Sequence, residues 1–153
     1  MQIPASKQEL LELIRAEWSA LDARVAPLSD EQLAAPRLAG SWSIKDVLAH
    51  ITWWQLRMLR RLNNEQLPFA LPGETHETTI QRINDEVYQE HSGQSPAEIK
   101  AGYYASFEHV MESLAGYSEE FLLAHREEIQ GDTWDHYAEH NAAIRQGLSP
   151  EGK

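Results

Sequence analysis

The sequence predicts an all-α protein that folds as a four-helix bundle with one long crossover connection. Three observations lead to this prediction. Apolar residues recur at helical spacing in several long segments, and none of the 153 residues belongs to the alternating pattern of a strand. Several segments open with Ser or Asp followed three residues later by Glu, Gln or Asp, which is typical of a helix N-terminus. A proline-rich segment forms the long connection, and such a connection usually makes two neighbouring helices parallel.

The first predicted helix begins after Ser6, which forms a capping signature with Glu9, and ends before Pro27. Spacings of three and four residues place five side chains on its core face: Leu10, Ile14, Trp18, Leu21 and Val25. The stretch "SDEQL" then predicts a short helical turn, and "PRLAGSWS" predicts a loop.

The second helix is predicted to begin after Ser43, which pairs with Asp46 in a second capping signature, and to extend to about Asn63. Its core stripe consists of Ile44, Leu48, Ile51, Met58 and Leu62. The stripe beside it consists of Val47, His50, Trp54, Arg57 and Arg61. This pattern places His50 at the margin of the buried face.

The segment "NNEQLPFALPGETHE" contains two prolines and a glycine, so it is predicted to be the crossover. A third helix follows over about residues 78–90, with Ile80, Ile83 and Val87 toward the core. Ser95 and Pro96 then mark the start of a further long helix that ends at Gly116. Its inward residues are Ile99, Tyr103, Phe107, Val110 and Leu114.

The last helix is predicted to follow a turn at Gly131, with Asp132 and Asp135 as its capping signature. Tyr137, Ile144 and Leu148 lie on its core face. The chain contains no internal repeat and no low-complexity tract, so residues 1–153 are expected to form a single domain.

Composition narrows the classes of function. The net charge of -11 leaves no basic surface for phosphates or for anionic lipids, so neither nucleic acid nor a membrane is expected as a partner. The N-terminus has no signal-peptide pattern, and no stretch approaches the roughly 20 apolar residues of a membrane span, so a cytoplasmic location is expected. Because the chain has no cysteine, any metal must be held by nitrogen and oxygen ligands.

Two histidines of the last helix, His136 and His140, stand four residues apart, so that both can reach one ion. His50 supplies a third imidazole if its helix packs beside the last one. Three neutral imidazoles suit Zn²⁺ or Ni²⁺ and leave coordination positions open. The alternative is that these histidines are surface residues or hydrogen-bonded core residues. The other four are interpreted as surface or loop residues: His76, His91, His109 and His125.

Aromatic and basic residues near these histidines suggest a substrate pocket. Trp54 lies one helical turn after His50, and Trp134 precedes the HxxxH pair, although core packing is the simpler explanation for each tryptophan taken singly. Arg57 lies on the face of His50 and is a candidate for receiving an anionic substrate. Asp46 is interpreted as a helix cap rather than as a partner of His50. Spacing places no carboxylate near the ion, so the catalytic residues, including the general base, stay unassigned.

The stretches "GSWSIKDVLAHITWWQ" and "GDTWDHYAEHNAAIRQ" resemble the DinB/YfiT-like superfamily, in particular its ClbS/DfsB-like branch. The resemblance implies an up-down-down-up bundle in which His50, His136 and His140 hold Zn²⁺ or Ni²⁺. Relatives implied by it include bacillithiol and mycothiol transferases, a maleylpyruvate isomerase, and a resistance protein that opens a cyclopropane without requiring metal.

Three hypotheses follow. The first is a metal-dependent hydrolase or thiol S-transferase that acts on a small electrophilic molecule, with a low-molecular-weight thiol as a candidate cosubstrate. The alternative is a ClbS/DfsB-like small-molecule binding or resistance protein that uses no metal. A third hypothesis is a bundle that acts by dimerising with itself or with a partner. It predicts a large apolar exterior face and histidines too far apart to converge on one ion.

Overall fold

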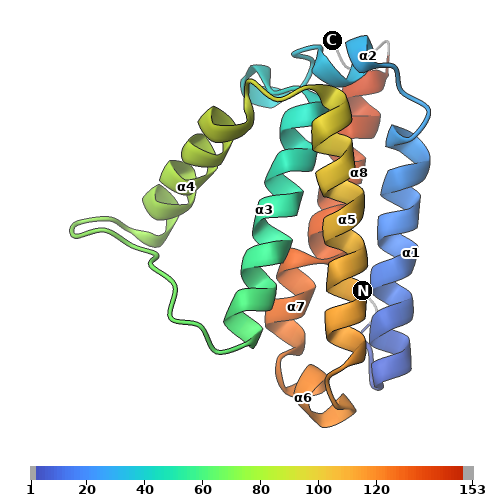
Figure 1. Ribbon diagram of the computed structural model, residues 1–153, viewed down its shortest axis with the longest axis vertical. Helices are drawn as coiled ribbons and strands as arrows, with labels where there is room; N and C mark the ends of the chain where they lie inside the picture. Colours follow the sequence, from blue (N-terminus) through green and yellow to red (C-terminus); the bar gives the residue numbers. More distant parts are fainter. Residues whose placement is uncertain (1–2, 150–153) are drawn as a thin grey trace.

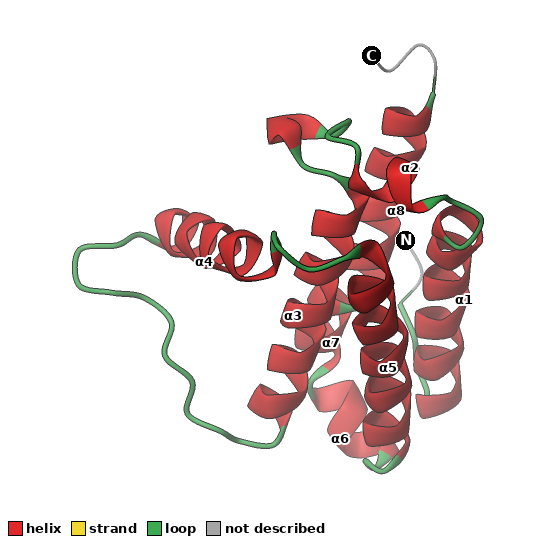
Figure 2. Ribbon diagram, turned by 45° about the horizontal axis from the view of Figure 1, so that its top comes forward, coloured by secondary structure: helices red, strands yellow, loops and turns green. Residues whose placement is uncertain are grey.

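The computed structural model describes residues 3–149 as helices joined by turns and loops, with no strand in that range (Figure 2). This confirms the predicted all-α class. The elements, in chain order, are α1 (Lys7–Val25), α2 (Asp30–Ala34), the 3-10 helix η1 (Ala39–Ser41), α3 (Ile44–Leu62), α4 (His76–His91), α5 (Pro96–Ala115), α6 (Glu119–Ala124), α7 (Arg126–Asp132) and α8 (Trp134–Leu148).

Four long helices, α1, α3, α5 and α8, lie side by side (Figure 1), with α3 packed along α5 and α1 packed along α8. The chain runs upward in Figure 1 along α1 and α8 and downward along α3 and α5. The core between these helices is mostly apolar, with the buried Gln55 and Ser106 hydrogen-bonded to each other. Each helix contributes side chains that are fully buried, among them Leu21, Ile51, Met58, Tyr103 and Ile144.

Three of the predicted helix starts are capped as expected. The hydroxyl oxygens of Ser6 and Ser95 accept hydrogen bonds from the third residue of α1 and α5, respectively. Ser43 and Asp46 form a reciprocal pair, in which Ser43 Oγ accepts from the Asp46 amide and the Asp46 carboxylate accepts from the Ser43 amide at 2.8 Å. These bonds satisfy amide groups that have no partner within the helix. The interpretation of Asp46 as a helix cap is therefore confirmed.

The helix after the proline-rich connection takes a different position from the one the pattern suggested. α4 lies to the side of the other long helices and packs against α3 (Figure 1). Its buried residues Ile83 and Val87 join Trp54 of α3 in a small cluster separate from the main core, and Ile80 is only partly buried. Periodicity identifies the apolar face of a helix but not the helix that this face will contact.

The start of the last helix also differs from the prediction. Asp132 ends α7 rather than capping α8, and Gly131 lies within α7 instead of forming a turn. The N-cap of α8 is Thr133, whose side chain makes no capping bond and donates to the Ile129 carbonyl at 2.6 Å. The prediction failed because residues 126–132 are themselves helical, so the chain kinks at Thr133 instead of starting a helix from a loop.

None of the helices within residues 3–149 combines the length and the hydropathy of a membrane span.

Candidate metal centre

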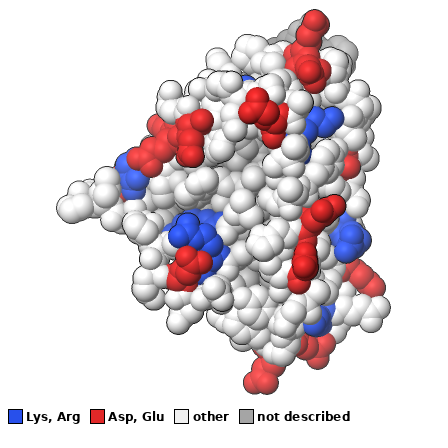
Figure 3. Space-filling view, viewed as in Figure 1, with Lys and Arg blue, Asp and Glu red and all other residues white. Residues whose placement is uncertain are grey.

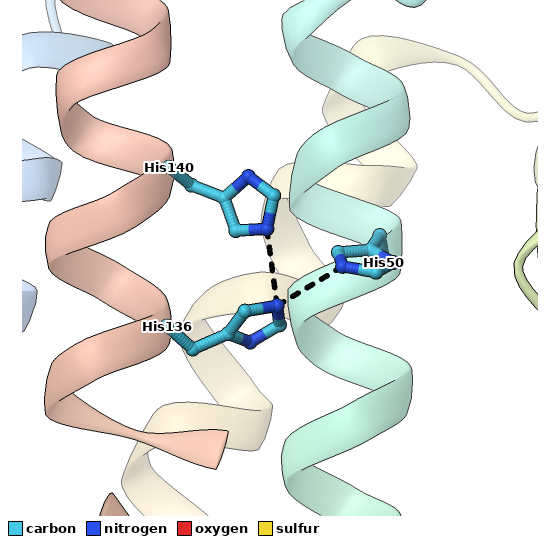
Figure 4. Close-up of side chains that lie close together, drawn as sticks. All are labelled: His50, His136 and His140. Atoms are coloured by element: carbon cyan, nitrogen blue, oxygen red, sulfur yellow. Dashed lines mark hydrogen bonds between the residues drawn. The ribbon is translucent and has the colours of Figure 1, made fainter. Parts of the chain in front are cut away.

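His50 of α3 and His136 and His140 of α8 point toward one another between the two helices (Figure 4). The Nε2 atom of His136 lies 3.0 Å from Nε2 of His50 and 3.0 Å from Nε2 of His140. One ring nitrogen of each residue lies within 4.8 Å of the other two. The structure therefore brings together the three histidines that the sequence singled out.

The packing of both helices explains this convergence. On α8, Tyr137 and Ile144 are buried in the main core, which fixes the rotation of the helix. The i, i+4 spacing then turns His136 and His140 together toward α3. On α3, His50 is 7% exposed and lies between the fully buried Leu48 and Ile51. Each imidazole is thus held by the core contacts of its own helix.

Burial keeps the three imidazoles neutral. Burial, together with repulsion by His140 and His50, lowers the pKa of His136 from 6.5 to about 2. Burial and a smaller effect of His140 lower the pKa of His50 to about 3, and burial lowers that of His140 to about 4. A protonated ring would be poorly solvated here and would repel its neighbours. Neutral rings offer lone pairs to a metal ion, so the donor set fits a borderline divalent cation.

The outer ring nitrogens of two of these histidines are buried. Among the described residues, Nδ1 of His136 has no hydrogen-bond partner, and Nδ1 of His50 has none with good geometry, although the Asn84 side chain lies close enough to His50 to raise its pKa. In metal sites this nitrogen usually donates to a carboxylate, a carbonyl or water, which fixes the orientation of the ring.

α4 places the polar side chain of Asn84 beside His50. This side chain opposes the effect of burial on the pKa of His50, and its Oδ1 accepts a hydrogen bond from Trp54 Nε1 at 2.9 Å. No sequence pattern indicated Asn84, because the position of α4 against α3 could not be derived from periodicity.

Aromatic rings surround His50. The ring of Trp54 lies 6.4 Å from that of His50, and the ring of Trp42 lies 5.7 Å from it, in edge-on arrangements. Trp42 also stacks on Tyr88 of α4, with ring centroids 5.6 Å apart. Sequence reasoning placed Trp54 near His50 but missed Trp42, which precedes the cap Ser43, and Tyr88. Together these rings form an apolar wall on one side of the histidine cluster.

The other two predicted pocket residues, Trp134 and Arg57, differ in their surroundings. Trp134 is 3% exposed and belongs to the main hydrophobic core. Arg57 lies seven residues after His50 on α3, with its guanidinium carbon 5.8 Å from the centre of the Trp54 ring and 5.3 Å from that of Phe69. Arg57 is therefore connected to the histidine cluster through the ring of Trp54.

One carboxyl group near this region has a perturbed pKa. Asp132, four residues before His136, is partly buried, and burial raises its pKa from 3.8 to about 6. Arg61 and Arg57 act in the opposite direction, while Glu128 adds to the rise. A carboxyl group that titrates near pH 6 can hold or release a proton under physiological conditions. The pKa of Asp132 is raised because the residue is partly buried at the end of α7, and not because it caps α8.

Comparisons with known proteins bear on both the family and the fold. The sequence profile described as the DinB superfamily matches residues 13–143. A search of curated proteins found no matching sequence.

Solved structures with this fold include three that are similar over nearly the whole chain. An uncharacterised protein from Escherichia coli UTI89 has a TM-score of 0.80 at 17% identity, over 94% of this chain and 93% of its own. The colibactin self-resistance protein ClbS, crystallised with double-stranded DNA, has a TM-score of 0.81 at 15% identity, over 95% and 96%. DfsB, described as a sibling lethal factor precursor, has a TM-score of 0.74 at 16% identity, over 94% and 95%.

The ClbS complex corrects one prediction. Net charge was used to exclude nucleic acid as a partner, yet a protein of the same fold has been crystallised with double-stranded DNA. The exclusion is therefore wrong. Net charge averages over the whole surface, whereas contact with a duplex depends on where the cationic side chains lie.

Proposed function

Because the chain belongs to the DinB superfamily, we propose that it is a metal-dependent enzyme that binds one Zn²⁺ or Ni²⁺ through His50, His136 and His140. The observation that carries the proposal is the convergence of three neutral imidazoles from two helices on one point. Exposed histidines at random positions would not converge on one buried point.

The chain's own residues would bind and orient the substrate. A divalent ion in this position would supply Lewis acidity, which polarises a substrate or lowers the pKa of a thiol or of water. Trp54, Trp42 and Tyr88 would exclude water from one side, and Arg57 would attract an anionic group. The substrate class that suits these parts is a small electrophilic molecule. The proposed reaction is hydrolysis or transfer to a low-molecular-weight thiol. Because the chain has no cysteine, such a thiol would be a cosubstrate.

The proposal includes the arrangement of the chain. We assign α1, α3, α5 and α8 to an up-down-down-up four-helix bundle of one domain, in which the 63–75 loop and α4 together form the crossover. The packing of α3 along α5 and of α1 along α8 supports this assignment. In such a bundle, His50, His136 and His140 face one another across α3 and α8.

Metal analysis of untagged protein tests the proposal. The purified chain should contain about one Zn²⁺ or Ni²⁺ per molecule, and His140→Ala should lose most of it. His109→Ala, at an exposed position on α5, is the matched control and should retain the metal. Wild-type protein that is free of metal and cannot be loaded would refute the proposal.

A second candidate is a binding or resistance protein that uses no metal. The unpartnered Nδ1 atom of His136 favours it, because a metal site usually supplies an acceptor there. Since ClbS was crystallised with double-stranded DNA, a short duplex is the first ligand to titrate. Duplex binding that survives both chelation and His136→Ala would favour this candidate. Absence of binding at low salt would count against a DNA ligand.

A further inference from the structure

A cavity lies between α3, the 63–75 loop and α4. Its volume is about 490 Å³, which falls within the range of small-molecule sites. The apolar part of its lining comes from Trp53, Leu56, Phe69 and Ile83, so it is contributed by all three segments. A ligand in this cavity would contact an apolar surface on several sides.

The basic residues of this cavity differ in whether they have partners. Arg82 is engaged by Glu74 at 2.7 Å and by the Phe69 carbonyl at 2.7 Å. Arg60 pairs with Glu65 at 3.1 Å at an exposed position. Arg57, which also lines the cavity, has no ion pair and no hydrogen bond within the described part of the chain. One cation therefore faces the cavity without an anion in contact.

The surroundings of Arg57 make its positive charge unfavourable as long as no anion is in contact with it. Burial lowers the pKa of its guanidinium, and the neighbouring cation Arg61 lowers it further. Asp132 and Glu128 act in the opposite direction, but Glu128 is bound to Arg61 at 2.7 Å. Since arginine remains charged in proteins, the cost of holding this cation is relieved by an incoming anion rather than by loss of a proton.

The cavity lies within reach of the metal centre. Seven residues separate His50 from Arg57, which is about 10 Å along α3 at 1.5 Å per residue. The ring of Trp54 bridges this interval, because it contacts the ring of His50 and the guanidinium of Arg57. Figure 3 shows basic side chains gathered beside α3 at the loop that leads to α4.

We infer that this cavity binds a small organic acid that has an apolar tail and one carboxylate. The tail would lie against Phe69, Trp53 and Leu56, and the carboxylate would accept hydrogen bonds from the Arg57 guanidinium. One unpaired guanidinium matches a single negative charge, and its planar fork suits a carboxylate. The inference extends the proposed function, because it names the substrate class of the same enzyme, yet the binding itself requires no metal.

Calorimetric titration with 3-phenylpropionate tests the inference, with 3-phenyl-1-propanol as the uncharged counterpart of equal length. Wild-type protein should bind the acid at least about tenfold more tightly than the alcohol. Arg57→Gln should weaken binding of the acid by about tenfold or more and remove the preference over the alcohol. Arg145→Gln, an exposed arginine of α8 outside the cavity, is the matched control and should change binding of the acid by less than about threefold. Chelated and metal-loaded protein should bind the acid equally within about threefold.

Equal binding of acid and alcohol by wild-type protein would overturn the inference, and so would failure to bind the acid at millimolar concentration. The comparison of acid and alcohol uses wild-type protein alone, so that misfolding of a variant cannot affect it. Binding of the acid that disappears on chelation would place the carboxylate at the histidine cluster and would also overturn it. Metal content measured on the same samples keeps the two proposals apart, since Arg57→Gln should retain the metal.

Discussion

Asp132 provides a quantitative test of how burial controls charge near the candidate site. Burial raises the pKa of Asp132 from 3.8 to about 6, net of the attraction by Arg61 and Arg57. Since one pKa unit corresponds to about 1.4 kcal/mol, holding this carboxyl in its ionised form costs about 3 kcal/mol of folding stability at high pH. Asp132→Asn keeps the shape of the side chain and removes that cost. The variant should therefore be more stable than wild type at pH 8.

The sign of the pH dependence follows from the direction of the change. Because the pKa is raised on folding, the contribution of Asp132 is fully present below its unfolded value of 3.8 and is lost as pH rises through about 6. Urea unfolding at pH 8 should show Asp132→Asn more stable by about 1 to 3 kcal/mol, narrowing to about 1 kcal/mol or less at pH 4.5.

The control for this comparison is Asp85→Asn, an exposed position on α4 that should change stability by less than about 0.5 kcal/mol at both pH values. A variant of Asp132 that is less stable than wild type at pH 8 would refute the reasoning. A difference that does not change with pH would refute it as well.

Three further outcomes are expected. Ser43→Ala removes the acceptor of the Asp46 amide at the start of α3 and should lower the free energy of unfolding by about 1 kcal/mol in urea, without changing metal content. Tyr137→Phe leaves the buried Gln55 Oε1 without its donor and should cost about 1 to 3 kcal/mol in the same assay; an unchanged midpoint would contradict this hydrogen bond. In thermal unfolding, Zn²⁺ at about 100 times its Kd should stabilise wild-type protein by about 3 kcal/mol and should not stabilise His136→Ala. Equal stabilisation of both proteins would argue against the histidine cluster as the binding site.

Much of the helical framework could be predicted from the sequence because local signals determine it. Ser6, Ser43 and Ser95 cap helices where the sequence placed them, and the helices end close to the predicted residues. The predicted DinB superfamily membership is confirmed, and the shared fold of ClbS and DfsB agrees with the predicted branch. The proximity of His50 to the HxxxH pair could be predicted from helical periodicity, together with the expectation that α3 and α8 are neighbours.

Features that depend on how distant segments pack could not be predicted. Nothing local to α4 indicates that it lies beside α3 and carries Asn84 and Tyr88 toward the histidines. The capping signature at Asp132 and Asp135 was misleading, because a capping pattern is also compatible with the last turn of a preceding helix. The cavity at Arg57 requires three segments to meet, and its missing anion becomes visible only when the partners of each arginine are known.

The coordination of the metal ion tests the central claim most directly. X-ray absorption spectroscopy of untagged, zinc-loaded protein should show three imidazole nitrogens at about 2.0 to 2.1 Å from Zn²⁺, and the same spectrum of His140→Ala should show fewer. Zinc surrounded by oxygen ligands alone, or a wild-type spectrum that the loss of His140 leaves unchanged, would contradict the assignment of this cluster as a metal centre.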